Sequence, residues 1–151
     1  MNFLNKQELT AQQLFQVADD AYLNGSPWQL KTFQTELLNE YTHYLGMVDD
    51  LGRLIGFVGG TYLDGVLDIS NIAIMQAYQK QHLGELLLRT WFNMFVAQTT
   101  VLLEVRDGNE GAKRLYRRLG FETYRKRKAY YNHPVEDAVL MMLQLPIRSK
   151  E

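Results

Sequence analysis

The chain has 151 residues, the length of one ordinary domain, and its hydrophobic fraction of 46% and charged fraction of 22% are typical of a soluble globular protein. With no cysteine, it has neither disulfides nor a thiol nucleophile, and its net charge of -1 argues against general nucleic-acid binding. No apolar run reaches the ~20 residues that a membrane helix needs, so we expect no membrane partner.

The sequence also predicts the cellular location of the protein and its domain organisation. The first residues show no basic region followed by an apolar stretch of signal-peptide length, so the cytoplasm is the expected location. The three histidines lie too far apart in the sequence to suggest a metal site. We see no repeat, low-complexity stretch or linker, and we therefore expect a single domain over residues 1–151 that works as a monomer or a weak dimer.

Two short helices are expected near the start of the chain. Thr10 followed by Gln13 has the form of a capping box, in which each residue satisfies a backbone N–H of the other. Ser26-Pro27 with Gln29 indicates a second helix start, with proline at the first helical position. Apolar residues recur at helical spacing after each start, which supports both predictions.

Strand-forming segments follow over residues 44–48, 54–63 and 66–74, and the glycine-containing turns between them indicate an antiparallel meander. The rest of the chain alternates helix, strand, helix and two strands. Grouped strands followed by alternating elements predict an α/β fold with a mixed, mainly antiparallel central sheet of about six to seven strands, flanked by about four helices. The later elements are expected over residues 84–96, 101–105, 110–119, 122–128 and 138–145.

A phosphate-binding loop is predicted between the strand over 66–74 and the helix over 84–96. At such a junction, free backbone N–H groups and the positive end of the helix dipole face one point, where an anion binds well. The same residues are also compatible with a plain loop that leads into a helix. The predicted loop consists of Gln79, Lys80, Gln81, His82, Leu83 and Gly84.

Basic residues gather in the later part of the chain, where eight of the sixteen lysines and arginines fall between Lys113 and Lys128. One interpretation is a solvated helix face followed by a strand edge that its charges protect from pairing. The other is attraction of an anion, either the phosphates of a nucleotide cofactor or ribosomal RNA near the substrate. Balanced charge elsewhere makes direct nucleic-acid binding the less favoured of these.

Two separated segments carry a family resemblance through Asn71-Ile72-Ala73-Ile74, Tyr78–Gly84, Leu103–Arg106, Asn109, Tyr116 and Leu119-Gly120-Phe121. They resemble the GNAT family of N-acetyltransferases, and within it the ribosomal-protein-alanine N-acetyltransferases (RimI type), over about residues 69–145. His82 stands where the family usually carries a glycine, which lets a pyrophosphate approach the backbone closely.

The resemblance implies a GNAT-like fold and acetyl-CoA as the acetyl donor, with no metal. Backbone groups of Ile72, Ala73 and Ile74 would pair with the pantetheine amides as another strand does, and one N–H would polarise the thioester oxygen. Asn109 is implied to hydrogen-bond the pantetheine arm, although an asparagine at this position is equally suited to cap a helix.

Two residues are implied to carry the chemistry. Glu104 resembles the general base, since a carboxylate partly withdrawn from water at the end of an apolar strand accepts a proton more readily. The alternative is a structural ion pair with Arg106 or Lys113. Tyr116 resembles the general acid that protonates the coenzyme A sulfur, and it would also contact the cofactor; the alternative is a buried core tyrosine. Together they imply direct transfer in a ternary complex.

The favoured acceptor is an α-amino group. With a pKa near 8 it is about 2.5 units easier to deprotonate than a lysine, which is worth roughly 3.4 kcal/mol. RimI-type enzymes are similar in acetylating the N-terminal alanine of a ribosomal protein, and their equivalents of Tyr130 and Tyr131 wall the peptide channel. Two alternatives stay open: a GNAT enzyme acting on a small amine or an aminoacyl-tRNA, and a non-catalytic acyl-CoA-binding module.

Overall fold

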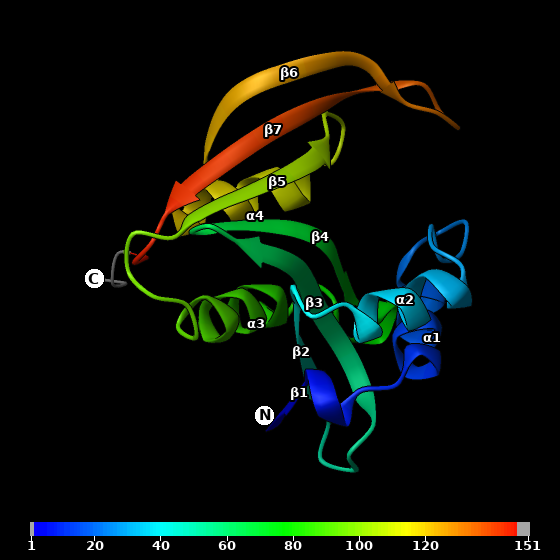
Figure 1. Cartoon of the computed structure of the whole chain (residues 1–151). Coiled ribbons are helices and arrows are strands. Elements are labelled where there is room, and N and C mark those ends of the chain that lie inside the picture. The colour runs from blue at the N-terminus through cyan, green and yellow to red at the C-terminus, as the bar shows by residue number, and fades with distance from the viewer. Residues whose placement is uncertain (1, 148–151) are drawn as a thin grey trace.

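In the computed structural model, residues 2–147 are described, and they form one seven-stranded sheet in the order β1-β2-β3-β4-β5-β7-β6 (Figure 1). All neighbouring strands run antiparallel except β4 and β5, which are parallel. The mixed, mainly antiparallel sheet is therefore confirmed. The strands are β1 (Asn2–Asn5), β2 (Thr42–Val48), β3 (Leu54–Leu63), β4 (Val66–Ile74), β5 (Thr100–Arg106), β6 (Glu122–Tyr131) and β7 (Glu136–Gln144).

Helices cover both faces of the sheet and divide the interior into two cores. Neighbouring residues of a strand point to opposite faces, and Phe57 of β3 belongs to the core beneath α1 and α2, whereas Val58 belongs to the core beneath α3 and α4. In the described range the α-helices are α1 (Ala11–Ala21), α2 (Leu30–Leu38), α3 (Leu83–Phe92) and α4 (Glu110–Leu119). Short 3-10 turns precede two of them: η1 (Lys6–Glu8) lies before α1, and η2 (Gln76–Tyr78) lies before α3.

The first helix begins as predicted and the second does not. Thr10 caps α1: its hydroxyl accepts a hydrogen bond from the Gln13 backbone N–H at 3.2 Å, and the Gln13 side chain accepts one from the Thr10 N–H at 2.9 Å. The predicted start at Ser26-Pro27 is wrong, because α2 begins at Leu30. The Ser26 hydroxyl instead closes a local turn by donating to the Trp28 carbonyl at 2.6 Å.

Other elements also differ from the prediction: β2, β5 and β6 are longer than expected, and β7 begins two residues earlier and ends one residue earlier. Helix α3 ends at Phe92, four residues before Val96, because the chain leaves the helix through turns in which the N–H groups of Met94 and Phe95 donate to Trp91 and Phe92. Strand β1 was not predicted at all. It is four residues long with no buried residue, and it exists because β2 provides a partner strand.

The sheet opens between its two parallel strands. Within the described residues, β4 pairs with β5 only over Val66–Asp68, opposite Thr100–Leu102. Beyond these residues β4 follows β3 and β5 follows β7, so the two strands diverge (Figure 1). An extra residue in β4, Ser70, forms a bulge between the parts that pair with Gly60 and Gly59, and a bulge bends a strand.

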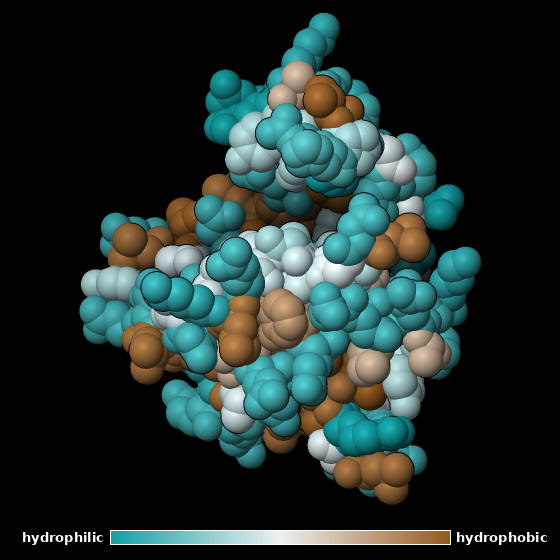
Figure 2. Space-filling model, turned by 90° about the vertical axis from the view of Figure 1, so that its right-hand side faces the viewer, coloured by the Kyte–Doolittle hydropathy of each residue, from teal (hydrophilic) through white to brown (hydrophobic). Residues whose placement is uncertain are grey.

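The surface is hollowed on this side of the molecule. Figure 2, which views the right-hand side of Figure 1, shows a hollow below the β6–β7 part of the sheet, with hydrophobic atoms in its depth and hydrophilic atoms around its rim.

None of the helices in the described part of the chain is long and apolar enough to cross a membrane.

Candidate active site

The diverging strand β4 exposes backbone groups toward the opening. The Met75 N–H donates to the Ile55 carbonyl at 2.9 Å, and in an antiparallel pair the hydrogen-bonded residues alternate, so the groups of Ala73 face β3. The N–H and carbonyl groups of Ile72 and Ile74 therefore point away from β3, into the split. Of the three residues predicted to pair with pantetheine, Ile72 and Ile74 thus have backbone groups that point into the split, whereas those of Ala73 bond to β3.

Both of these carbonyls receive a side-chain hydrogen bond. The Tyr22 hydroxyl donates to the Ile72 carbonyl at 3.0 Å, and the Gln79 amide donates to the Ile74 carbonyl at 2.7 Å. Tyr22 follows the last residue of α1, so this helix reaches across to the edge of β4. Gln79 belongs to the predicted phosphate loop, and its contact ties that loop to the strand.

The loop before α3 has an unusual backbone. Lys80 has a φ of 62° and His82 a φ of 61°, the left-handed region that glycine adopts most readily. Among residues 2–147, no side chain caps α3, so the N–H groups of Leu83 and Gly84 in its first turn remain available for an anion. At position 82, where the family usually carries glycine, the backbone thus needs a positive φ as well as room for a pyrophosphate to approach. The need for a positive φ was not predicted from the sequence.

A buried carboxylate holds the loop and its helix in place. Glu85, in the first turn of α3, is only 3% exposed, and its two oxygens accept hydrogen bonds from Arg89 at 3.0 Å and from Arg118 of α4 at 2.8 Å. A buried charge with these partners fixes α3 against α4. Glu85 was not among the predicted site residues, because its position next to Gly84 gives no sign that it is buried.

Glu104 lies on β5 at the opening and has neither of the ion pairs considered for it. Arg106 pairs with Glu136 at 3.3 Å, and Lys113 pairs with Asp107 at 3.1 Å and with Glu110 at 3.0 Å. The alternative of a structural ion pair is therefore contradicted. Glu104 is exposed rather than partly withdrawn from water.

Tyr116 lies on the buried face of α4. It is 6% exposed, and its ring contacts Phe121 in a T-shaped arrangement at 5.7 Å. Burial raises the pKa of the Tyr116 phenol, and the nearby phenols of Tyr22 and Tyr131 raise it further. The hydroxyl therefore remains protonated near neutral pH, as a proton donor must, and the core and catalytic interpretations are compatible.

This chemistry can be compared with known proteins. The model of the Acetyltransferase (GNAT) family matches residues 11–121. The chain belongs to the GNAT acetyltransferase family. A relative from Haemophilus ducreyi, named [ribosomal protein bS18]-alanine N-acetyltransferase, is 34% identical over 88% of this chain and 92% of its own length.

Solved structures agree with the fold. The ribosomal-protein-S18-alanine N-acetyltransferase from Escherichia coli superposes with a TM-score of 0.84 at 26% identity, covering 99% of this chain and 96% of the other. Arabidopsis thaliana NAA60, solved in complex with acetyl-CoA, superposes with a TM-score of 0.77 at 18% identity, over 95% and 98% of the two chains. The protein is an acetyl-CoA-dependent N-acetyltransferase.

The described residues fit this cofactor. The uncapped start of α3 suits a pyrophosphate, and the edge of β4 that has no partner strand beyond Asp68 suits an amide-containing arm. Bound acetyl-CoA supplies the thioester-linked acetyl group. In the part of the chain that the structure describes, no group of three or more histidine, aspartate or glutamate side chains could hold a metal ion.

Asn109 caps α4, which was the alternative role predicted for this residue. Its side-chain oxygen accepts a hydrogen bond from the Ala112 N–H at 3.1 Å. Its contact with pantetheine stays a prediction for this acetyltransferase.

The tyrosine pair lies at the end of β6. The rings of Tyr130 and Tyr131 meet edge to face at 5.2 Å, and Tyr130 is 43% exposed. Burial, together with the charge of Glu104, raises the pKa of Tyr131 to about 12, and the Arg106 guanidinium lies 4.4 Å from the centre of its ring. Tyr131 is therefore a neighbour of Glu104, which suits a wall of the acceptor channel.

Asp68 is a further carboxylate that the sequence analysis missed. It lies where β4 and β5 separate, and partial desolvation and the charge of Glu104 raise its pKa. In the sequence, Asp68 is an aspartate within a predicted strand of alternating polar and apolar residues. Such a position alone does not distinguish a functional aspartate from one that is simply exposed to water.

The basic stretch is partly committed to ion pairs. Lys113 contacts Asp107 and Glu110, Arg118 contacts Glu85, and Lys126 lies 3.9 Å from Asp107. Its later part runs along β6, whose residues are exposed over almost their whole length at the edge of the sheet. This agrees with a protected strand edge. Attraction of cofactor phosphates stays a prediction.

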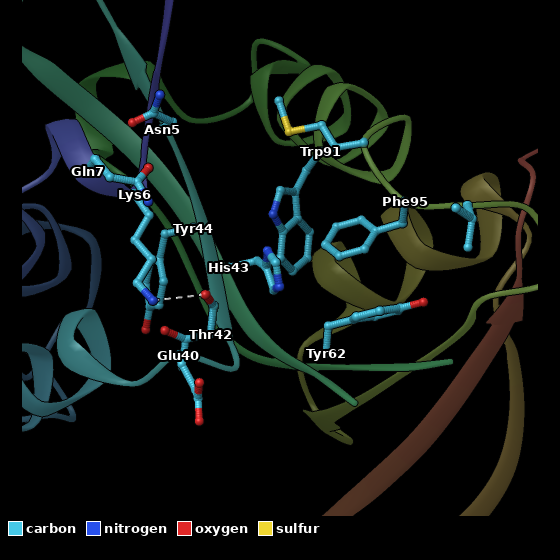
Figure 3. Close-up of a pocket in the computed structure, with 12 residues that line it drawn as sticks. Asn5, Lys6, Gln7, Glu40, Thr42, His43, Tyr44, Tyr62, Trp91 and Phe95 are labelled. Atoms are coloured by element: carbon cyan, nitrogen blue, oxygen red, sulfur yellow. Dashed lines mark hydrogen bonds between the residues drawn. The ribbon is translucent and has the colours of Figure 1, made fainter. Parts of the chain in front are cut away.

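A second pocket lies away from the acetyltransferase site. It has a volume of about 400 Å³ and is walled by an aromatic group in which His43, Tyr62 and Phe95 contact one another (Figure 3). Lys6 at its other side donates to the Thr42 carbonyl at 3.1 Å. The pocket adjoins the C-terminal end of α3, about 15 Å of helix away from the phosphate loop.

Proposed function

We propose that this acetyltransferase moves an acetyl group from acetyl-CoA to the α-amino group of the N-terminal alanine of ribosomal protein bS18. The observation that carries the proposal is the similarity, over most of both chains, to relatives named for that reaction. The proposal is further supported by the unpaired carboxylate of Glu104 on β5, which borders the split, and by the protonated phenol of Tyr116 on α4.

Direct transfer in a ternary complex needs three proton movements. The Glu104 carboxylate accepts a proton from the acceptor ammonium group, directly or through a water, and leaves a neutral amine whose lone pair attacks the thioester carbon. As the carbon–sulfur bond breaks, the Tyr116 hydroxyl donates its proton to the departing sulfur, and the second proton of the nitrogen passes through water to the Tyr116 phenolate, which leaves a neutral amide and a protonated phenol. Such catalysis contributes about 10²–10⁴-fold, so holding the reactants together must supply much of the remaining acceleration.

Different parts of the opening would hold the cofactor. The first-turn N–H groups of α3, with the loop from Gln79 to Gly84, bind the pyrophosphate, and Lys80 adds a positive charge. The edge of β4 at Ile72 and Ile74 pairs with the pantetheine amides, with Ala73 keeping this edge attached to β3. Asn109, at the start of α4, and Tyr116, within it, would contact the arm.

The acceptor enters from the other side of the split. Tyr130 and Tyr131 wall its channel beside Glu104. The enzyme acts in the cytoplasm as a monomer or a weak dimer, without a membrane partner and without direct contact with nucleic acid. The finding that supports an N-terminal acceptor is the kinship with enzymes named for an N-terminal alanine.

The test is mass-spectrometric detection of acetyl transfer to an alanine-initiated peptide. A matched peptide has its N-terminus blocked and an internal lysine left free. Transfer to the free terminus alone supports the proposal. Transfer to the lysine, or to neither peptide while acetyl-CoA is shown to bind, would refute it in favour of another amine.

A further inference from the structure

Asp68 and Glu104 face the same side of the sheet at the point where it opens. Asp68 is the last residue of β4 that pairs with β5, and its partner is Leu102. Side chains of a strand alternate between faces, so Glu104, two residues beyond Leu102, lies on the same face. The two carboxylates therefore stand on the two arms of the split, on the face of the sheet against which α1 packs at β3 and β4.

Neither carboxylate is neutralised. Over residues 2–147, no ion pair reaches Asp68 or Glu104, because the nearest cation on β5, Arg106, is engaged with Glu136 and the Tyr131 ring. Two like charges that face each other without a cation are unfavourable, and a cation placed between them relieves the repulsion.

A buried polar group on the same face also lacks a hydrogen-bond partner. Asn71 lies on the same face of β4 as Asp68, since it pairs with Gly59 and Asp68 pairs with Thr61, with the Ser70 bulge between them. It is 6% exposed, and its side-chain N–H₂ has no hydrogen-bond partner among the described residues. A buried donor of this kind indicates that a ligand or water completes the site.

The acceptor supplies the missing cation. An α-amino group with a pKa near 8 is about nine-tenths protonated at pH 7, so it arrives as an ammonium ion. We propose that Asp68 is a positioning residue that holds this ammonium group beside Glu104. No bond to Asp68 forms or breaks: the proton passes to Glu104, and Asp68 remains a carboxylate throughout. The inference rests on the proposed function, because it assumes an amine acceptor at this opening.

The test compares two Asp→Asn variants. Asp68→Asn keeps the shape of the side chain and removes its charge, and Asp64→Asn removes a charge in the exposed β3–β4 turn, four residues earlier in the chain and outside the split. At saturating acetyl-CoA, Asp68→Asn should raise the KM for the alanine-initiated peptide about tenfold, the loss of one charge-assisted hydrogen bond, with kcat within about twofold. Asp68→Glu should restore most of the loss, and Asp64→Asn should match the wild type.

An equilibrium measurement separates this inference from the proposed function. The peptide with a free N-terminus and the same peptide already acetylated are each titrated calorimetrically into protein saturated with coenzyme A. The wild type should prefer the free amine, and Asp68→Asn should lose that preference. An unchanged preference, or an equal loss in Asp64→Asn, would overturn the role of Asp68. A wild type that shows the preference but transfers no acetyl group would refute only the proposed function.

Discussion

Replacing His82 with glycine should stabilise the protein, because His82 holds a left-handed backbone at the start of α3. Its φ of 61° and ψ of 17° place its Cβ close to the following carbonyl, and its side chain makes no capping hydrogen bond in the described structure. The strain is therefore not offset by a cap. Glycine, which has no Cβ, adopts this conformation freely.

The expected gain is modest and calculable. A non-glycine residue in this region costs about 1–2 kcal/mol, and glycine returns about 0.4–1 kcal/mol of it through the greater freedom of the unfolded chain. The net gain in the free energy of unfolding is about 0.5–1 kcal/mol. For a chain of this size, that corresponds to a rise in Tm of about 1–4 °C.

Differential scanning calorimetry of the free protein measures this shift, and isothermal titration measures acetyl-CoA affinity, which should stay equal or become tighter. His82→Ala is the matched control, because it removes the imidazole and keeps the strained backbone, so its Tm should not rise. A lower Tm for His82→Gly would refute the strain argument. A loss of acetyl-CoA affinity above about tenfold in both variants would show that the imidazole itself is a ligand.

Three other substitutions test the site. Tyr116→Phe should lower kcat about 10²-fold or more while acetyl-CoA affinity, measured by titration, is largely kept, and unchanged turnover would exclude it as the acid. Glu104→Gln should lower kcat about 10²–10⁴-fold, most steeply at low pH where the amine arrives protonated; a pH–rate profile parallel to the wild type would contradict this role. Tyr22→Phe frees the Ile72 carbonyl, so titration should show acetyl-CoA binding about two- to fivefold tighter, and weaker binding would mean that the hydroxyl contacts the cofactor.

The sequence predicted the bounds of an element correctly where residues next to the boundary determine them. The prediction for α4 over residues 110–119 agrees with the structure because Asn109 caps its start and Gly120, with a φ of 106°, ends it. The two strands of the β3–β4 hairpin were predicted at their observed bounds because a turn with Asp64-Gly65 separates two runs of strand-forming residues.

Features that depend on distant partners could not be predicted in this way. Strand β1 forms only against β2, and the ion pairs of Arg106 and Lys113 depend on how β7 and α4 are placed. The role of Asp68 depends on where β4 leaves β5, which is a matter of register rather than of neighbouring residues. The family motif located Glu104 and Tyr116, whereas their surroundings required the fold.

The most direct test of the account is to locate the acetyl group on intact ribosomal protein bS18 by tandem mass spectrometry, after incubation with acetyl-CoA and either the wild type or Glu104→Gln. The account predicts acetylation of the α-nitrogen of the N-terminal alanine by the wild type and a large loss with the variant. Acetyl groups on lysine side chains alone, or equal modification by both proteins, would contradict it.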